Sequence, residues 1–243
     1  MGLKLMCVVA HPDDECFAFG GVLALAAERG VETYVVCLTD GQAAKNRGDA
    51  VSGAALGEMR RKEFAASCKV LGVTHHELMD LQDGRLEFTD FSKTAGQLVE
   101  RMRRFRPHVV ITFGTDGGLN THADHMMASM LTTAAFHWCG QARRYPDLGA
   151  VHQPDRLFYL TTNFFIPGRP APKPMPWTVT LDIRSVQQRK HEAFRQHVSQ
   201  APLMEQTKGF FERHGAEEFY TLVATAEPQA ARQMTDLFEG LGE

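Results

Sequence analysis

The residues that could do chemistry appear first in one short run, Ala10-His11-Pro12-Asp13-Asp14-Glu15. The run follows the apolar segment 3–9, which is short enough for a buried strand, so an imidazole and three carboxylates stand at a predicted strand end. In open α/β sheets, ligands bind outside the carboxyl ends of the strands. A divalent cation binds carboxylate and neutral imidazole together and offsets the repulsion between adjacent acids. We therefore expect a metal site here.

A simpler interpretation makes these acids the first turn of a helix. Asp and Glu are favoured there because they meet unsatisfied N–H groups and the positive end of the helix dipole. Glu15 fits that role. The dipole explains neither the preceding His11 nor the two further acids, so we favour the site interpretation.

A second polar group, Thr121-His122-Ala123-Asp124-His125, is predicted to open a helix. Thr121 and Asp124 have the spacing of a capping box, which would leave the histidines incidental. His122 and His125 are three residues apart on one helical turn, however, so their rings can point the same way. Because the helix follows the predicted strand 108–113, the pair is expected at the same sheet edge as the first run.

A catalytic zinc needs three nitrogen or oxygen ligands and one position open to water. His11, Asp14 and one histidine of the pair supply that set. Asp13 then remains as a general base for the attacking water. The second histidine is left to stabilise the oxyanion or to protonate the leaving nitrogen.

The remaining chain predicts elements that could position these groups. Strands are expected at 3–9, 31–38, 75–81, 108–113, 156–162 and 177–181, and helices at 19–30, 56–72, 91–105, from 121 onward, and at 185–200, 202–214 and 227–241. Strand and helix alternate four times at the start. That order predicts an α/β fold with a Rossmann-like, mostly parallel sheet, helices on both faces, and the site at the C-terminal edge of the strands.

Two further polar loops fall on the same edge, Thr39-Asp40-Gly41 and Gln82-Asp83-Gly84. The segment Gln42 to Ala55 has no periodicity and is expected to be a mobile loop beside the site. A Pro-rich crossing is expected at about 163–176. No interdomain linker is evident, so we expect a single domain spanning 1–243.

Composition narrows the class of protein. With 243 residues, a formal net charge of -3 and 23% charged residues, the chain gives no sign of a nucleic-acid footprint. No apolar run reaches the roughly 20 residues of a membrane span, and no signal peptide is evident, so we expect a cytoplasmic protein. Five scattered cysteines indicate neither a disulfide framework nor a thiolate zinc site.

The two polar groups together resemble the paired signature of the LmbE-like, or PIG-L, zinc de-N-acetylases. That family includes deacetylases of N-acetylglucosaminyl-phosphatidylinositol and of mycothiol and bacillithiol biosynthesis. Weaker likenesses extend along most of the chain, and they comprise Thr39-Asp40-Gly41, the segments 57–63 and 71–73, Asp83-Gly84, Lys190, the segment 197–200 and the segment 217–219.

The resemblance implies a role for each site residue. It makes His11, Asp14 and His125 the metal ligands, Asp13 the general base and His122 the electrostatic or acid partner. Substrate contacts are expected from Arg60, Asp40, Gly41 and Asn120, with Glu15 and Asp124 supporting the ligands. Some family members carry a tyrosine that helps bind the acetyl oxygen where this chain has Asn120, so oxyanion binding is expected to rest more on the metal and His122.

The first functional hypothesis is a zinc-dependent hydrolase that removes the N-acetyl group from an N-acetylglucosamine-type sugar or its conjugate. Zn²⁺ is the expected cofactor, with Fe²⁺ as another divalent choice, and a homo-oligomer is expected from the resemblance. The alternative within the same class is an amidase that cleaves a larger acyl group from a thiol-sugar conjugate.

Two alternatives come from other classes of protein. A metal-binding protein without catalysis would have the same ligands. A nucleotide-binding module is disfavoured, because the first strand-to-helix turn is acidic and lacks Gly-x-Gly-x-x-Gly.

Overall fold

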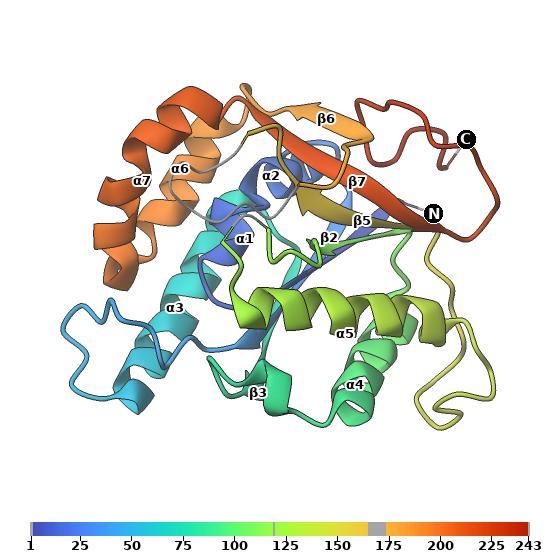
Figure 1. Cartoon of the computed structure of the whole chain (residues 1–243), viewed down its shortest axis with the longest axis horizontal. Helices are drawn as coiled ribbons and strands as arrows, with labels where there is room; N and C mark the ends of the chain where they lie inside the picture. The colour runs from blue at the N-terminus through green and yellow to red at the C-terminus, as the bar shows by residue number, and fades with distance from the viewer. Residues whose placement is uncertain (1, 119, 165–173, 243) are drawn as a thin grey trace.

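A seven-stranded sheet with the strand order β3-β2-β1-β4-β5-β7-β6 forms the centre of the protein (Figure 1). The computed structural model describes residues 2–118, 120–164 and 174–242. The strands are β1 (Lys4–Val9), β2 (Glu32–Thr39), β3 (His75–Leu81), β4 (Val109–Phe113), β5 (Arg156–Thr161), β6 (Val179–Asp182) and β7 (Glu217–Thr225).

Strand direction sets the edge at which the site can form. β1 pairs in parallel with β2 on one side and with β4 on the other, and β2–β3 and β4–β5 are also parallel. β7 runs antiparallel to both β5 and β6. The predicted mostly parallel sheet is confirmed. Strand order reverses at β1, so the loops after β1 and β4 meet at the switch point where α/β sheets bind ligands.

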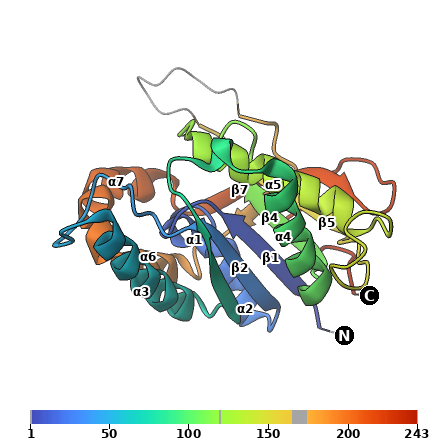
Figure 2. The same cartoon turned by 90° about the horizontal axis from the view of Figure 1, so that it is seen from below.

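Helices cover both faces of the sheet. They are α1 (Asp14–Phe17), α2 (Gly20–Glu28), α3 (Gly53–Leu71), α4 (Phe91–Phe105), α5 (Ala123–Cys139), α6 (Gln187–Arg195) and α7 (Ala201–His214), with 3-10 turns at Leu86–Phe88 and Val198–Gln200. α4 packs on α5 on one face of the sheet. On the opposite face, α2 and α3 pack on α6 (Figure 2). Leu5 to Val9 in β1 are 0% exposed, because helices shield the strand from both sides.

The C-terminal part departs from the sequence prediction. The strand β7 was not predicted, although Phe219 to Val223 is rich in the aromatic and β-branched residues that favour strands. The helix predicted at 227–241 is wrong. Met234, Leu237 and Phe238 have helical spacing and are buried, but this segment instead forms a bridge from Met234 to Val179 that covers the edge of β6.

Smaller differences concern where helices begin and end. The helix predicted at 19–30 is α2, and the separate short helix α1 precedes that range. The one predicted at 185–200 is α6 followed by a 3-10 turn. Most of the Pro-rich crossing predicted at 163–176 lies outside the described residues. Within the described residues, no helix is both long and apolar enough to cross a membrane.

A buried ion pair joins the C-terminal part to the start of α2. Glu218 on β7 accepts hydrogen bonds from the backbone N–H groups of Gly21 and Val22, at 2.7 and 2.9 Å, and Lys190 donates to it at 2.7 Å. A Cβ at Gly21 would lie 2.6 Å from the Glu218 carboxylate, so a side chain there would prevent this approach. Glu218 therefore caps the positive end of α2.

Candidate metal centre and active site

Three side chains from two loops converge at the carboxyl edge of the sheet. His11 follows β1, Asp14 opens α1, and His125 lies in the first turn of α5. The Nδ1 atom of His11 lies 3.3 Å from the Nε2 atom of His125 and 3.6 Å from a carboxylate oxygen of Asp14. His125 Nε2 lies 3.2 Å from the other oxygen of Asp14. All three residues are buried.

The outer nitrogen of each ring has a partner of its own. His11 Nε2 lies 3.0 Å from Asp83 and 3.2 Å from Asp124, and His125 Nδ1 lies 3.1 Å from the carbonyl oxygen of Gly117. These partners only accept, so each outer nitrogen donates. In neutral rings, the inner nitrogens then carry lone pairs directed at the Asp14 carboxylate. Partners of this kind fix the orientation of metal-ligating histidines.

The donor set fits a zinc-like ion. Ligand atoms about 2.0–2.2 Å from a tetrahedral ion are roughly 3.3–3.6 Å apart, close to the spacings of His11, Asp14 and His125. Although burial favours neutral groups, the two histidines hold the pKa of Asp14 well below its usual value. Similarly, burial opposes a charge on His11, but Asp124, Asp14 and Asp83 raise its pKa. A cation at this place would offset the same accumulation of negative charge.

Asp13 stands beside these atoms in an unusual backbone conformation. Its φ is 111°, in the region that residues with a side chain rarely adopt. One carboxylate oxygen accepts a hydrogen bond from Arg60 at 2.9 Å. Burial raises the pKa of Asp13 to about 6, against the opposing effect of Arg60. A carboxylate with this proton affinity is suited to accept a proton near neutral pH.

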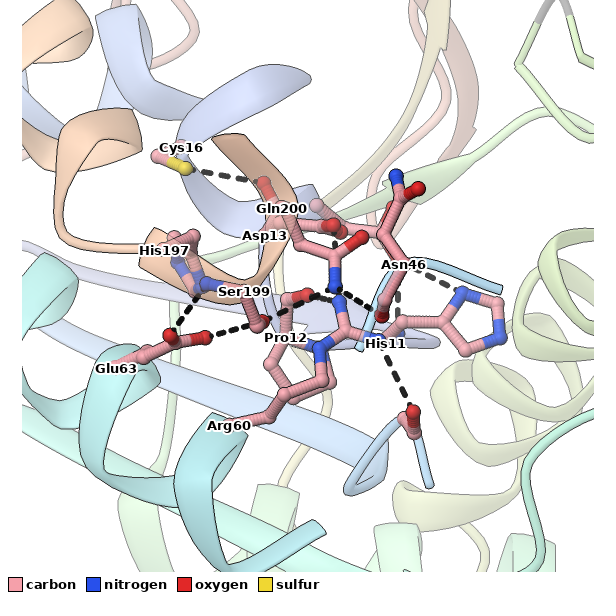
Figure 3. A network of polar contacts seen from close by, with 12 residues as sticks. His11, Pro12, Asp13, Cys16, Asn46, Arg60, Glu63, His197, Ser199 and Gln200 are labelled. Atoms are coloured by element: carbon pink, nitrogen blue, oxygen red, sulfur yellow. Dashed lines mark hydrogen bonds and ion pairs between the residues drawn. The ribbon is translucent and has the colours of Figure 1, made fainter. Parts of the chain in front are cut away.

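Arg60 on α3 is directed inward (Figure 3). Its guanidinium donates to Asp13, to the carbonyl oxygen of Pro12, and at 3.2 Å to the carbonyl oxygen of Gly41. Only 3% of the side chain is exposed. Gly41 has a φ of 68°, and a Cβ there would collide with the guanidinium, so this position requires glycine. The structure thus places Arg60 against the strained turn at Asp13.

His122 lies on the solvent-exposed side of the cluster formed by His11, Asp14 and His125. Its ring centroid is 4.8 Å from that of His11 and 5.2 Å from that of His125. His122 rather than Thr121 is the N-cap of α5, since its Nδ1 accepts the backbone N–H of Asp124 at 3.2 Å. The predicted capping box is therefore wrong. Burial and the two neighbouring histidines lower the pKa of His122, which favours a neutral ring with a proton on Nε2.

The remaining predicted residues lie in the surrounding loops. Asn120 is exposed, and its Oδ1 accepts the backbone N–H of His122 at 2.9 Å. Asp40 accepts from Arg61 at 3.0 Å. Glu15 and Asp124 are each 0% exposed, and Asp124 also accepts from the backbone of Gly84 and Leu86. Both acids therefore stabilise the loops around the proposed ligands.

Two parts of this arrangement were not predicted from the sequence. Asp83 was noted only as a polar strand end, yet it contacts His11. Arg60 and Ser67 face inward, and a signal for this was available. They share one helical stripe with the buried Leu56, Phe64 and Leu71, which marks that side of α3 as the inner face.

Comparison with known families identifies the chain. The PIG-L family, described as GlcNAc-PI de-N-acetylase, matches residues 6–136, which include both polar groups. The chain belongs to this family. It is therefore an amide hydrolase, like the relatives described below.

Two relatives differ in how much of the chain they cover. Mycothiol S-conjugate amidase of Streptomyces coelicolor is 33% identical over 65% of this chain, and the match spans 60% of that relative's length. A 1D-myo-inositol 2-acetamido-2-deoxy-alpha-D-glucopyranoside deacetylase of Rhodococcus jostii is 29% identical over 98% of both chains.

Solved structures support the fold. N,N'-diacetylchitobiose deacetylase from Pyrococcus horikoshii has a TM-score of 0.74 at 22% identity and covers 90% of this chain and 83% of its own. GalB, a 4-carboxy-2-hydroxymuconate hydratase from Pseudomonas putida, has a TM-score of 0.71 at 21% identity and covers 94% and 99%. A hydratase shares this fold with a deacetylase, so likeness of fold alone does not give the reaction or the substrate.

Proposed function

We propose that this protein is a divalent-metal-dependent hydrolase that removes the N-acetyl group from an N-acetylglucosamine-type sugar conjugate. One observation carries the proposal. Lone-pair atoms of His11, Asp14 and His125 face one another with the spacing of a tetrahedral ligand set, beside the buried carboxylate of Asp13. We take Zn²⁺ as the ion, with Fe²⁺ as the other divalent choice.

When bound, such an ion would polarise the amide carbonyl and acidify a water molecule. Asp13 would accept the proton of the attacking water. Its turn at φ 111° and its hydrogen bond to Arg60 fix the carboxylate beside the ligands, so the base is positioned before the substrate arrives.

His122 would act on the oxygen or nitrogen of the breaking amide. Because its Nδ1 accepts the N–H of Asp124, the neutral ring carries its proton on Nε2, which can donate. A donor directed at a developing oxyanion stabilises the transition state more than the ground state.

Substrate contacts are proposed on the loops around this centre. Asp40 and Gly41 follow β2, and Asn120 precedes α5, so they lie at the same edge of the sheet as the base. Arg60 would reach the sugar only if its present bonds to Asp13 and Gly41 loosened, since its side chain is 3% exposed. Its first role in this proposal is therefore to hold Asp13.

An amidase acting on a larger acyl group is the second candidate, favoured by the 33% identity to the Streptomyces coelicolor amidase. A small cavity of about 90 Å³ is lined mainly by apolar side chains, among them Phe17, Leu160 and Phe219, together with Lys190 and Glu218. It also borders Gly118, next to the carbonyl that bonds His125. Such a cavity suits an apolar group.

One experiment separates the two candidates. The zinc-loaded protein is incubated with 1D-myo-inositol 2-acetamido-2-deoxy-alpha-D-glucopyranoside, with N-acetylglucosamine, with chitooligosaccharides and with a mycothiol S-conjugate, and released acids and free amines are measured. Acetate release from the first three substrates supports deacetylation. Cleavage of the conjugate alone supports the second candidate, and no product from any of them contradicts both.

The single domain over 1–243, the cytoplasmic location and the homo-oligomer also remain proposals. Exposed apolar side chains of Phe88, Phe91 and Met130 lie on neighbouring elements that a second copy could cover. Light scattering of the purified protein tests the oligomer directly.

A further inference from the structure

Glu15 is the most deeply buried of the three acids in the run 10–15. It is 0% exposed and accepts three hydrogen bonds. One oxygen accepts the backbone N–H of Asp13 at 2.9 Å, and the other accepts Ser67 Oγ at 2.6 Å and His197 Nε2 at 2.7 Å. A side chain without exposed surface cannot contact substrate, and one with both oxygens occupied is a poor ligand for a further ion. Its contacts therefore point to Asp13.

His197 reaches this acid from 182 residues away in the chain. It follows α6, which packs on α1 and α3, and it precedes the 3-10 turn Val198–Gln200. Its side chain is 0% exposed. His197 lies outside the segment 6–136 that matches the family. The C-terminal part of the chain thus supplies a buried residue that contacts Glu15 in the run 10–15.

The contact acts on a strained backbone position. A residue with a side chain adopts φ 111° only where the surroundings enforce it. Arg60 fixes the carboxylate end of Asp13, and Glu15 fixes its N–H end (Figure 3 shows Asp13, Arg60 and His197). If the N–H were released, the peptide could rotate toward an ordinary φ. The carboxylate would then move away from the position that His11 and Asp14 define.

Electrostatic attraction strengthens the contact between Glu15 and His197. Although burial opposes ionisation of both groups, His197 holds the pKa of Glu15 below its usual value, and Glu15 raises the pKa of His197. A charged acceptor forms a shorter and stronger hydrogen bond to a backbone N–H than a neutral one. His197 and Ser67 therefore keep Glu15 in the state that binds Asp13 best.

We infer that Glu15, held by His197 and Ser67, is a positioning residue that fixes the strained turn of Asp13 for its role as general base. This inference rests on the proposed function. It assigns no direct contact with substrate or metal to any of the three residues.

The test uses variants remote from the motif in sequence, with 1D-myo-inositol 2-acetamido-2-deoxy-alpha-D-glucopyranoside as the probe substrate. His197→Ala removes the main partner of Glu15, and His197→Gln restores an N–H donor. Ser67→Ala removes only one hydroxyl group. It is therefore the second variant to use should His197→Ala fail to fold. Ser199→Ala is the matched control, since Ser199 is equally buried two residues further on but bonds Glu63 instead of the motif.

We expect His197→Ala to lower kcat by roughly 10–100-fold, with KM and metal content changed by less than about threefold. Ser67→Ala should lower kcat several-fold, and Ser199→Ala by less than about twofold. His197→Gln should recover most of the loss. In an Asp13→Asn background, where the base is already absent, His197→Ala should cost less than about threefold, because the two residues act as a unit.

Three outcomes would overturn the inference. One is an unchanged kcat in both His197→Ala and Ser67→Ala. Another is an equal loss in the Asp13→Asn background, which would make the role merely structural. The third is a loss in Ser199→Ala as large as in His197→Ala. Absence of turnover in the unmodified protein would instead defeat the proposed function, so the two failures are distinguishable.

Discussion

The Nδ1 atom of His11 and the Nε2 atom of His125 lie 3.3 Å apart, although 114 residues separate the two histidines. Their elements explain the contact. β1 and β4 are adjacent and parallel, so the loop after β1 and the helix after β4 begin side by side. Two ring nitrogens at this distance repel unless a proton or a cation lies between them. This relationship is the basis of the proposed metal centre.

Replacing Asp13 with asparagine should keep the metal and lose most of the turnover. The amide retains the shape of the carboxylate but cannot accept the proton of water, and removal of a general base typically costs about 10²–10⁴-fold. Elemental analysis and kcat measured on the same preparation check this. Near-normal turnover would move the base elsewhere, although Glu15, which is 0% exposed, could not replace it without a rearrangement.

His122→Ala tests whether this histidine is a ligand, since one ring nitrogen each of His11, His122 and His125 lie within 4.8 Å of one another. If His122 acts on the transition state, its removal should lower kcat by about 10²–10³-fold and leave the metal content intact. Loss of metal would make it a ligand. Unchanged turnover would leave it with only its capping role on α5.

Lys190→Ala should destabilise the fold through Glu218. Removing one partner of a buried ion pair typically costs about 3–5 kcal/mol, since the other charge stays buried. The midpoint of urea unfolding should fall clearly. Arg184→Ala is the control, because the pair of Arg184 with Asp182 is exposed and should contribute little. Equal midpoints for the two variants would contradict this role of Glu218.

The buried pair of Glu15 and His197 predicts a pH-dependent stability. The pKa of His197 is raised above its ordinary 6.5, so its contribution is fully present below pH 6.5 and is lost as pH rises through the raised value. The pKa of Glu15 is lowered from 4.5, so its contribution is lost only as pH falls below that value. The Tm difference between the unmodified protein and His197→Gln should therefore be largest between pH 4.5 and 6.5 and shrink above it. A difference that grows with pH would contradict this assignment.

The sequence allowed the centre of the site to be predicted because its signals are local. A buried run that stops at His11 marks a strand end, and parallel strands share one ligand edge. The partners of the ligands were not predictable in this way. Asp83 reaches His11 through the conformation of a loop, and His197 reaches Glu15 only because α6 packs on α1.

The same limit explains the errors at the C-terminal end. Met234, Leu237 and Phe238 have the spacing of a helix, and spacing alone does not show that an edge strand is available to pair with. β7 was missed although Phe219 to Val223 carries residues that favour strands, and only its position between β5 and β6 depends on the rest of the sheet.

The metal dependence of acetate release tests the central claim most directly. The protein is treated with a chelator, dialysed and reconstituted with Zn²⁺, and acetate released from 1D-myo-inositol 2-acetamido-2-deoxy-alpha-D-glucopyranoside is measured at each stage beside His125→Ala. We predict turnover in proportion to bound metal up to one ion per chain, and neither stable metal nor turnover in the variant. Full turnover after complete removal of metal, or an unchanged one-to-one metal content in His125→Ala, would contradict the account.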